Sequence, residues 1–289
     1  MTAGYGRDAV WRRDAVWRRD AGWRRDPGWR RDPGWRRDPG WRRDPGWRRD
    51  PGWRRDAAFA AASCAVLAAY NNVIGAQAWH RRWYAPANAC AAAAALATAR
   101  AAGLGARELG LGPGQWRPGR LGSALAAATA AGYLAAAAIP VTRPLLNDKR
   151  ATNLDARGLV YQVAFRIPVG TVLWEEIAFR GVLQAALRRV MPGPASIAVT
   201  SGVFGVWHIR PTAAALRIND LAGGRRRATA RVAAGVAATA AGGALFSWMR
   251  ARSGRLAAPV ALHLATNCAG PLVAWAVARA RFRTGRVLA

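Results

Sequence analysis

The chain has 289 residues, of which 44 are Lys or Arg and 15 are Asp or Glu, so its net charge is +29. Such a charge is typical of nucleic-acid-binding proteins, and a mean hydropathy near zero is typical of soluble ones. Both averages combine two unlike parts. Residues 1–56 contain 17 Arg and 9 Asp, whereas residues 57–289 contain long runs of Ala, Val and Leu with the charges gathered between them. The composition therefore excludes a chain disordered throughout and argues against nucleic acid as the main partner.

Residues 1–56 form a low-complexity arm that settles into the hexapeptide Trp-Arg-Arg-Asp-Pro-Gly. Asp-Pro-Gly-Trp suits a type II turn, and Pro and Gly interrupt strand pairing, so we expect a disordered string of turns. Arg beside Trp favours an anionic lipid surface, and nucleic acid is the alternative partner. Expansion of a simple DNA repeat, or a start codon assigned too far upstream, would leave the arm without a function.

Apolar segments follow one another through the rest of the chain. A bilayer core of about 30 Å requires about 20 apolar residues in a helix. Seven segments approach this length: 57–79, 85–103, 121–140, 159–187, 194–216, 228–249 and 256–278. The sequence therefore predicts an all-α polytopic membrane bundle of about seven (six to eight) transmembrane helices. Residues 57–157 hold the first helices, and 279–289 form a basic tail.

Composition also bears on location. Abundant Ala, Arg and Gly with a single lysine, Lys149, indicate a G+C-rich bacterial genome and hence the bacterial cytoplasmic membrane. The 17 Arg residues of the arm predict a cytoplasmic N-terminus by the positive-inside tendency. Alternating seven spans then leaves the basic run 225–227 outside, so either the count is off by one or a segment is re-entrant. His80, followed by two arginines, is expected to be an interfacial anchor.

The scarcest ionisable residues lie inside the predicted spans. The chain has three glutamates and three histidines; Glu175 and Glu176 lie in the fourth span, His208 in the fifth and His263 in the seventh. Ionisable residues are costly within a bilayer, so their presence there indicates a functional site. Arg180 lies four residues after Glu176, on the same helix face, where the two can pair.

These side chains suit the hydrolysis of a peptide bond. A carboxylate can accept a proton from water while an imidazole positions that water, and further donors can stabilise the oxyanion. The spacing of His263 and Asn267 places an imidazole and an amide one turn apart. The same set could hold zinc through Glu175, His208 and His263. The sequence contains no HExxH motif, so we favour a site without a metal. The three cysteines include no CxxC pair and predict neither a zinc ribbon nor a disulfide framework.

At these positions the chain resembles the CPBP family of intramembrane proteases, which includes the CAAX prenyl endopeptidases of the Rce type and bacterial proteins linked to bacteriocin self-immunity. The family motifs EExxxR, FxxxH and HxxxN stand at 175–180, 204–208 and 263–267. The resemblance covers roughly residues 158–275, and we expect a protease core over 158–278. The arm has no counterpart in the family.

The resemblance implies a role for each motif residue. Glu175 would be the general base, His208 would assist it, and His263 and Asn267 would bind the oxyanion. Glu176, Arg180 and Phe204 would support the site, although an ion pair and a packed ring can also be purely structural.

The expected function is therefore that of an intramembrane endopeptidase, glutamate-dependent or metal-dependent. Its partners would be the lipid bilayer and a membrane-anchored protein or peptide substrate. The alternative is a non-enzymatic membrane immunity or scaffold protein that retains the fold.

Overall fold

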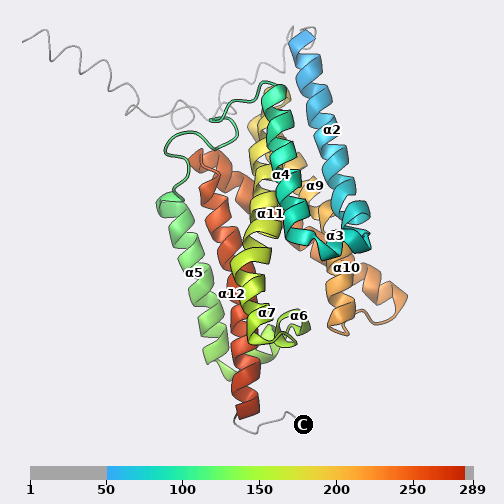
Figure 1. Cartoon of the computed structure of the whole chain (residues 1–289), viewed down its shortest axis with the longest axis vertical. Helices are drawn as coiled ribbons and strands as arrows, with labels where there is room; N and C mark the ends of the chain where they lie inside the picture. The colour runs from blue at the N-terminus through green and yellow to red at the C-terminus, as the bar shows by residue number, and fades with distance from the viewer. Residues whose placement is uncertain (1–50, 284–289) are drawn as a thin grey trace, which may run out of the picture. The chain divides into compact units, whose positions relative to one another are not determined.

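The computed structural model describes residues 51–283, and all the regular structure within that range is helical (Figure 1). The all-α prediction is confirmed for these residues. Most of the arm, and the last residues of the basic tail, lie outside the described residues. The elements are α2 (Pro51–Val73), η4 (Ile74–Ala76), α3 (Ala78–Arg82), α4 (Tyr84–Ala101), α5 (Gly119–Ala138), η5 (Pro140–Leu146), α6 (Lys149–Thr152), α7 (Ala156–Tyr161), η6 (Gln162–Leu173), η7 (Glu176–Leu183), α8 (Gln184–Val190), α9 (Gly193–Trp207), α10 (Ile209–Ile218), α11 (Arg225–Ser253) and α12 (Ala257–Arg283).

Two helices extend into the segments assigned to the arm and to the basic tail. Helix α2 begins at Pro51, so residues 51–56 of the arm are helical. Proline is well tolerated there because the N–H groups of the first helical residues have no intrahelical acceptor. At the other end α12 runs to Arg283, so residues 279–283 of the predicted tail are helical.

Within residues 51–283, four helices are long and apolar enough to cross a membrane, as in an integral membrane protein. They cover Gly52–Ala76, Gly119–Ala138, Arg225–Ser253 and Ala257–Ala280, and they correspond to four of the seven predicted spans. The other three segments fall short of these criteria. The segment 85–103 corresponds to the 18-residue, alanine-rich helix α4. The segment 159–187 carries several charges, and the segment 194–216 is broken into two helices.

The broken segment corrects the expectation of a continuous span over 194–216. Helix α9 ends at Trp207 and α10 begins at Ile209, with His208 between them. Pro211 accounts for the break, because it has no N–H to bond the carbonyl of Trp207 and its ring crowds that turn. The break places His208 where the chain changes direction.

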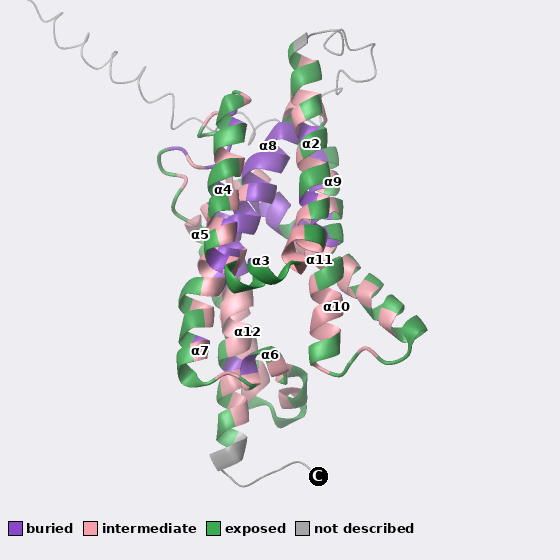
Figure 2. Cartoon of the chain, turned by 45° about the vertical axis from the view of Figure 1, so that its right-hand side comes forward, coloured by how far each residue is buried: buried purple, intermediate pink, exposed green. Residues whose placement is uncertain are grey.

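A continuous helix from 156 to 190, made of α7, η6, η7 and α8 and called here the motif helix, carries the first family motif. Pro168 interrupts its hydrogen-bond ladder, and η6 and η7 have wide π-helical turns of the kind found at functional sites. Buried residues concentrate along its second half, whereas the outer faces of α2, α4 and α5 are exposed (Figure 2). An exposed face of Ala, Leu and Val suits lipid.

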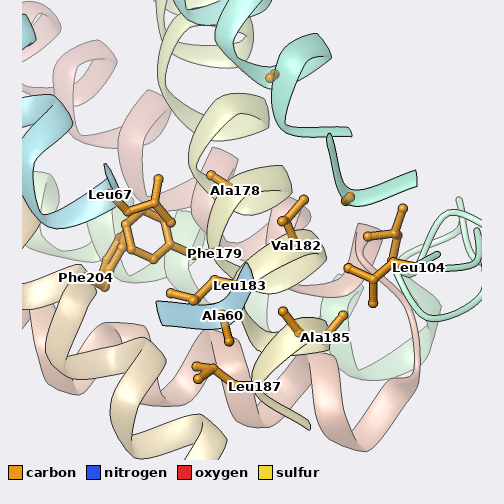
Figure 3. Close-up of a cluster of buried hydrophobic side chains, with 14 of the residues drawn as sticks. Ala60, Leu67, Leu104, Ala178, Phe179, Val182, Leu183, Ala185, Leu187 and Phe204 are labelled. Carbon is orange, nitrogen blue, oxygen red and sulfur yellow. The ribbon is translucent and has the colours of Figure 1, made fainter. Parts of the chain in front are cut away.

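The main core lies where the motif helix meets α2, α4 and α9. Phe179 and Leu183 are fully buried and pack with Leu67 of α2 and Phe204 of α9 (Figure 3). This packing fixes the rotation of the motif helix, and therefore the directions of the glutamates one turn earlier.

Glycines allow two helices to approach the core closely. A Cβ on Gly243 of α11 would lie 3.0 Å from the Phe204 ring, and a Cβ on Gly205 of α9 would lie 3.0 Å from the Val236 carbonyl oxygen. Small residues serve this purpose at helix contacts in membranes. Helices α9 and α11 are thereby held together behind the buried glutamates.

His80 is not the interfacial anchor that we expected. It is 1% exposed, because α3 turns back so that its imidazole meets α4. Its Nε2 lies 2.9 Å from Oδ1 of Asn88, which also accepts a hydrogen bond of 3.0 Å from the Tyr70 hydroxyl. The neighbouring Trp79 and Trp83 are the exposed residues of this segment.

Candidate active site

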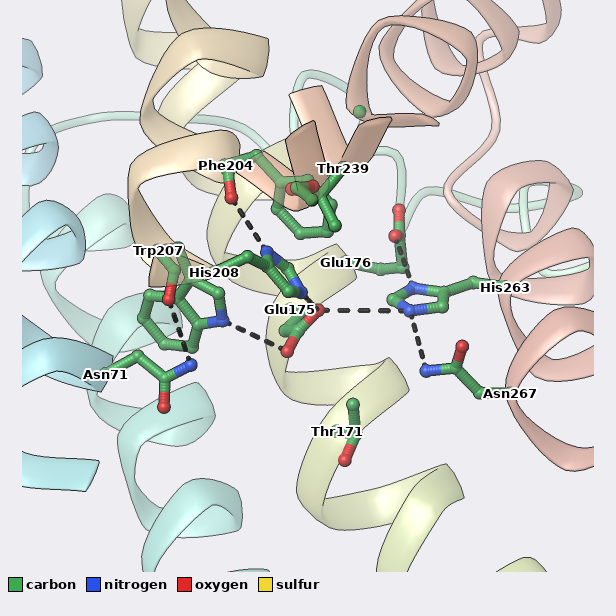
Figure 4. A network of polar contacts seen from close by, with 12 residues as sticks. Asn71, Thr171, Glu175, Glu176, Phe204, Trp207, His208, Thr239, His263 and Asn267 are labelled. Carbon is green, nitrogen blue, oxygen red and sulfur yellow. Dashed lines mark hydrogen bonds and ion pairs between the residues drawn. The ribbon is translucent and has the colours of Figure 1, made fainter. Parts of the chain in front are cut away.

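The fold brings the predicted site residues together from three separate helical segments (Figure 4). Glu175 and Glu176 come from the motif helix, and His208 comes from the break between α9 and α10. His263 and Asn267 lie one turn apart on α12. Residues separated by almost ninety positions in the sequence thus share one buried cluster.

Glu175 occupies the middle of this cluster. Its Oε1 accepts a hydrogen bond of 3.1 Å from the indole N–H of Trp207. Its Oε2 is buried and has no hydrogen-bond partner. This oxygen faces Nε2 of His208 at 4.0 Å and Nε2 of His263 at 3.8 Å. One oxygen of the carboxylate is therefore held in place, and the other is directed at two imidazoles.

Glu176 forms a second, tighter unit on the adjacent side. Its Oε1 accepts a hydrogen bond of 3.1 Å from Arg180 and lies 2.9 Å from Nδ1 of His263. Arg180 also donates to the carbonyl of Gly243 across 3.2 Å. The spacing of four residues predicted the Glu176–Arg180 pair, and both side chains are fully buried. His263 and Gly243 add hydrogen bonds that stabilise the buried pair, whereas Oε2 of Glu176 and Nε of Arg180 are buried without a hydrogen-bond partner.

Both histidines are held through Nδ1. Nδ1 of His208 lies 2.8 Å from the carbonyl oxygen of Phe204, whose ring packs on the imidazole at 4.5 Å. A carbonyl can only accept, so this contact places a proton on Nδ1 and directs Nε2 of His208 toward Glu175. Nδ1 of His263 faces a carboxylate in the same way, and its Nε2 lies 3.1 Å from Nδ2 of Asn267.

Accessibility differs within the cluster. The side chain of His208 is 19% exposed, whereas those of Glu175 and His263 are 5% exposed. His208 therefore lies on the open side of the site, and Glu176 and Arg180 lie on the closed side.

The zinc alternative can be compared with the distances between the candidate ligands. Zinc bonds of about 2.0–2.1 Å to nitrogen or oxygen place neighbouring ligand atoms of a tetrahedron about 3.3 Å apart. The separations of Glu175 Oε2 from the two Nε2 atoms are 4.0 and 3.8 Å. Among residues 51–283, no group of three His, Cys, Asp or Glu side chains has the arrangement of a metal site. The chain would have to contract around an ion to hold it.

The structure adds residues to the site that we did not predict. Trp207 stands inside the FxxxH motif, directly before the histidine, and bonds Glu175. Tyr70, Asn71 and Asn72 of α2 contact the chain around His208. A sequence signal for them exists, because three consecutive polar residues interrupt an otherwise apolar span.

Comparison with known proteins identifies a family that part of the chain matches. Residues 158–269 match the family model described as type II CAAX prenyl endopeptidase, Rce1-like, and this range contains all three motifs. The family is one of proteases. No curated protein and no solved structure matches the chain.

Proposed function

Because residues 158–269 form a domain of the Rce1-like type II CAAX prenyl endopeptidase (CPBP) family, we propose that the protein hydrolyses a peptide bond of a membrane-associated protein or peptide. The observation that carries this proposal is the unpartnered, buried Oε2 of Glu175 facing two imidazole nitrogens. A carboxylate oxygen so placed is ready to accept a proton from water.

Water is activated between Glu175 and His208. Atoms 4.0 Å apart can both lie within hydrogen-bond distance, about 2.8 Å, of one water oxygen. That water donates one proton to Oε2 of Glu175 and the other hydrogen bond to Nε2 of His208. As this proton moves from the water to Glu175, the water O–H bond breaks and the water oxygen bonds to the carbonyl carbon of the substrate.

The negative charge that develops on the substrate oxygen is stabilised by His263 and Asn267. Because Nδ1–H of His263 donates to Glu176, its Nε2 can donate as well only when the imidazole is protonated on both nitrogens. In that form Glu176 holds Nδ1–H of His263, and the Asn267 amide, whose Nδ2 lies 3.1 Å from Nε2 in the structure, turns so that Nε2–H and the amide N–H both face the oxyanion.

The reaction closes when Glu175 returns its proton. The amide nitrogen of the substrate accepts this proton as the C–N bond breaks, which releases one fragment as an amine and the other as a carboxylic acid. Glu176, Arg180 and Phe204 support the site without touching the substrate. This sequence of steps requires no metal ion, and zinc held by Glu175, His208 and His263 is the alternative that a chelator test decides.

We place the protein in the bacterial cytoplasmic membrane with its N-terminus in the cytoplasm, on the basis of its composition and the 17 Arg residues of the arm. Through those arginines and the interleaved tryptophans the arm binds anionic lipid. Bacteria generally lack protein prenylation, so a peptide precursor or a membrane-anchored protein suits the site better than a prenylated CAAX protein.

The decisive experiment compares the membrane proteomes of cells that express the wild-type protein and the Glu175→Gln variant. An uncleaved precursor should accumulate in the variant, and the purified wild-type protein in vesicles should cleave it. Glu108→Gln is the matched control, because Glu108 pairs with Arg189 in a partly exposed contact away from the site. Full cleavage by Glu175→Gln protein would overturn the proposal. A cellular phenotype that survives this substitution but not truncation would favour the non-enzymatic alternative.

A further inference from the structure

We propose that Asn71 and Asn72 of α2 are positioning residues of the active site, because their side-chain amides replace backbone hydrogen bonds that are missing at the His208 break. This inference rests on the proposed function for its catalytic meaning, but the contacts that carry it do not. Helix α2 lies outside residues 158–269, so the site depends on a part of the chain that the family match does not include.

Asn72 is inserted into one open turn of the helix. In an uninterrupted helix the N–H of Arg210 would bond the carbonyl of Val206. Here the N–H of Arg210 donates to Oδ1 of Asn72 across 3.2 Å, and Nδ2 of Asn72 donates to the carbonyl of Val206 across 2.9 Å. A single carboxamide thus connects the donor and the acceptor of the missing bond, in addition to the backbone N–H that the Val206 carbonyl already accepts at the end of α9. Because one end is a donor and the other an acceptor, the orientation of the amide is fixed.

Asn71 donates a hydrogen bond to the next carbonyl, that of Trp207. Pro211 has no N–H, so the carbonyl of Trp207 has no intrahelical partner four residues ahead. Nδ2 of Asn71 donates to this carbonyl across 3.2 Å. Adjacent amides of α2 therefore donate to successive carbonyls at the end of α9.

The two carbonyls belong to the residues that immediately precede His208. Holding them fixes the backbone that carries the imidazole, and the side chain of Trp207 is the hydrogen-bond donor to Glu175. Tyr70 contributes a third contact from α2, because its ring stacks on Trp207 with the ring centres 5.6 Å apart and the planes within 3°. The placement of both the base and its assistant thus depends on three consecutive residues of α2.

The test uses the fact that the chain has only three histidines. The full-length protein, labelled with 15N-histidine and placed in phospholipid vesicles, gives three sets of imidazole signals in solid-state NMR. Variants His208→Asn and His263→Asn assign them. In Asn72→Ala protein we expect the signals of His208 to broaden or split, because the ring takes more than one position, while those of His263 stay unchanged.

Gln77→Ala is the matched control. It removes an amide near the same end of α2 that bonds only the carbonyl of Val73, and all three sets of signals should stay as in the wild type. If Asn72→Ala protein fails to fold, the same NMR measurement is made on Asn72→Asp protein. Aspartate keeps the shape of the side chain but has no donor for the Val206 carbonyl. Signals of His208 with wild-type position and width in the folded Asn72 variant would overturn the proposal.

Activity adds a second readout. With a quenched-fluorescence peptide mixture as substrate, misplacing His208 should lower the rate about 10- to 100-fold in Asn71→Ala and Asn72→Ala proteins. Adding Pro211→Ala restores an N–H for the Trp207 carbonyl, so it should recover part of the Asn71→Ala loss. No recovery in this double variant would contradict the assignment of the bond from Asn71. If Glu175→Gln protein kept its activity while Asn72→Ala still moved the His208 signals, the proposed function would fail and this inference would stand.

Discussion

The indole N–H of Trp207 donates to Oε1 of Glu175 across 3.1 Å, and the indole is 1% exposed. Trp207 thus holds the carboxylate of Glu175, and His208, the next residue in the chain, faces the same carboxylate. Glu175 and His208, the proposed base and its proposed assistant, are therefore linked through Trp207.

Trp207→Phe should preserve the packing of this ring and remove its hydrogen bond. A hydrogen bond to a charged group contributes about 1.5–3 kcal/mol, so we expect peptidase activity to fall about 10- to 100-fold while the protein stays folded. Trp248→Phe, at an exposed position of α11, is the control and should leave the rate unchanged. Equal rates for the two variants in a purified assay would show that the indole does not position Glu175.

The buried and the exposed ion pairs should differ sharply in their effect on stability. Glu176→Gln leaves Arg180 as an uncompensated charge in a fully buried position, which should lower the free energy of unfolding by about 3–5 kcal/mol. Glu108→Gln breaks a partly exposed pair with Arg189 and should cost about 0–1 kcal/mol. Unfolding of both variants in the same detergent measures the difference, and comparable losses would contradict the burial of the first pair.

Two adjacent glycines of α11 predict opposite outcomes. A Cβ on Gly243 would lie 3.0 Å from the Phe204 ring and 3.3 Å from Nη2 of Arg180, so Gly243→Ala should destabilise the protein by about 1–3 kcal/mol. A Cβ on Gly242 would meet nothing within 4 Å, and Gly242→Ala should be neutral or stabilising by up to about 1 kcal/mol. Thermal unfolding compares the two, and the same shift for both would disprove the close contact of α11 with Phe204.

Chelators should leave the activity unchanged. The ligand separations at Glu175 exceed those of a tetrahedral zinc site, so neither EDTA nor phenanthroline should slow the purified enzyme. Loss of activity that zinc restores would instead assign Glu175, His208 and His263 as metal ligands.

A pH-sensitive contact lies in the loops outside the membrane helices. Asp148 caps α6, and its Oδ1 accepts a hydrogen bond of 3.2 Å from Asn219, which follows α10. Partial burial acts to raise the pKa of Asp148, but hydrogen bonds and charge from Arg150, together with the bond from Asn219, outweigh it and lower the pKa. The ionised carboxylate is thus favoured by the folded state.

A carboxylate with a lowered pKa stabilises the fold fully above its unfolded pKa, which is about 3.9, and loses that contribution as the pH falls through the folded value. The amides of Lys149 and Arg150, which bond Asn219 and Asp148, should therefore stay protected from hydrogen exchange at pH 5 and lose protection below about pH 3.9. Asp148→Asn protein should lack this pH dependence. A transition at the same pH in the variant would assign it to another group.

Much of the site could be predicted from the sequence. Glu175, Glu176, His208 and His263 were identifiable because ionisable residues are costly in a membrane and few other acids or histidines occur after residue 56. The spacing of four residues also predicted the pairing of Glu176 with Arg180, since helix periodicity is local. Family motifs at known spacing added the protease class.

Only the tertiary structure decided which residues complete the site. The contact of Asn72 with Val206 joins residues far apart in the chain, and it depends on the way that α2 packs against α9. Helix periodicity places side chains on a face but does not say which partner that face meets. For the same reason His80 was misjudged, because its burial depends on α3 turning back toward α4. The net charge of +29 describes the flanks of the helices, whereas the site depends on a few buried carboxylates, imidazoles and amides whose partners come from separate segments.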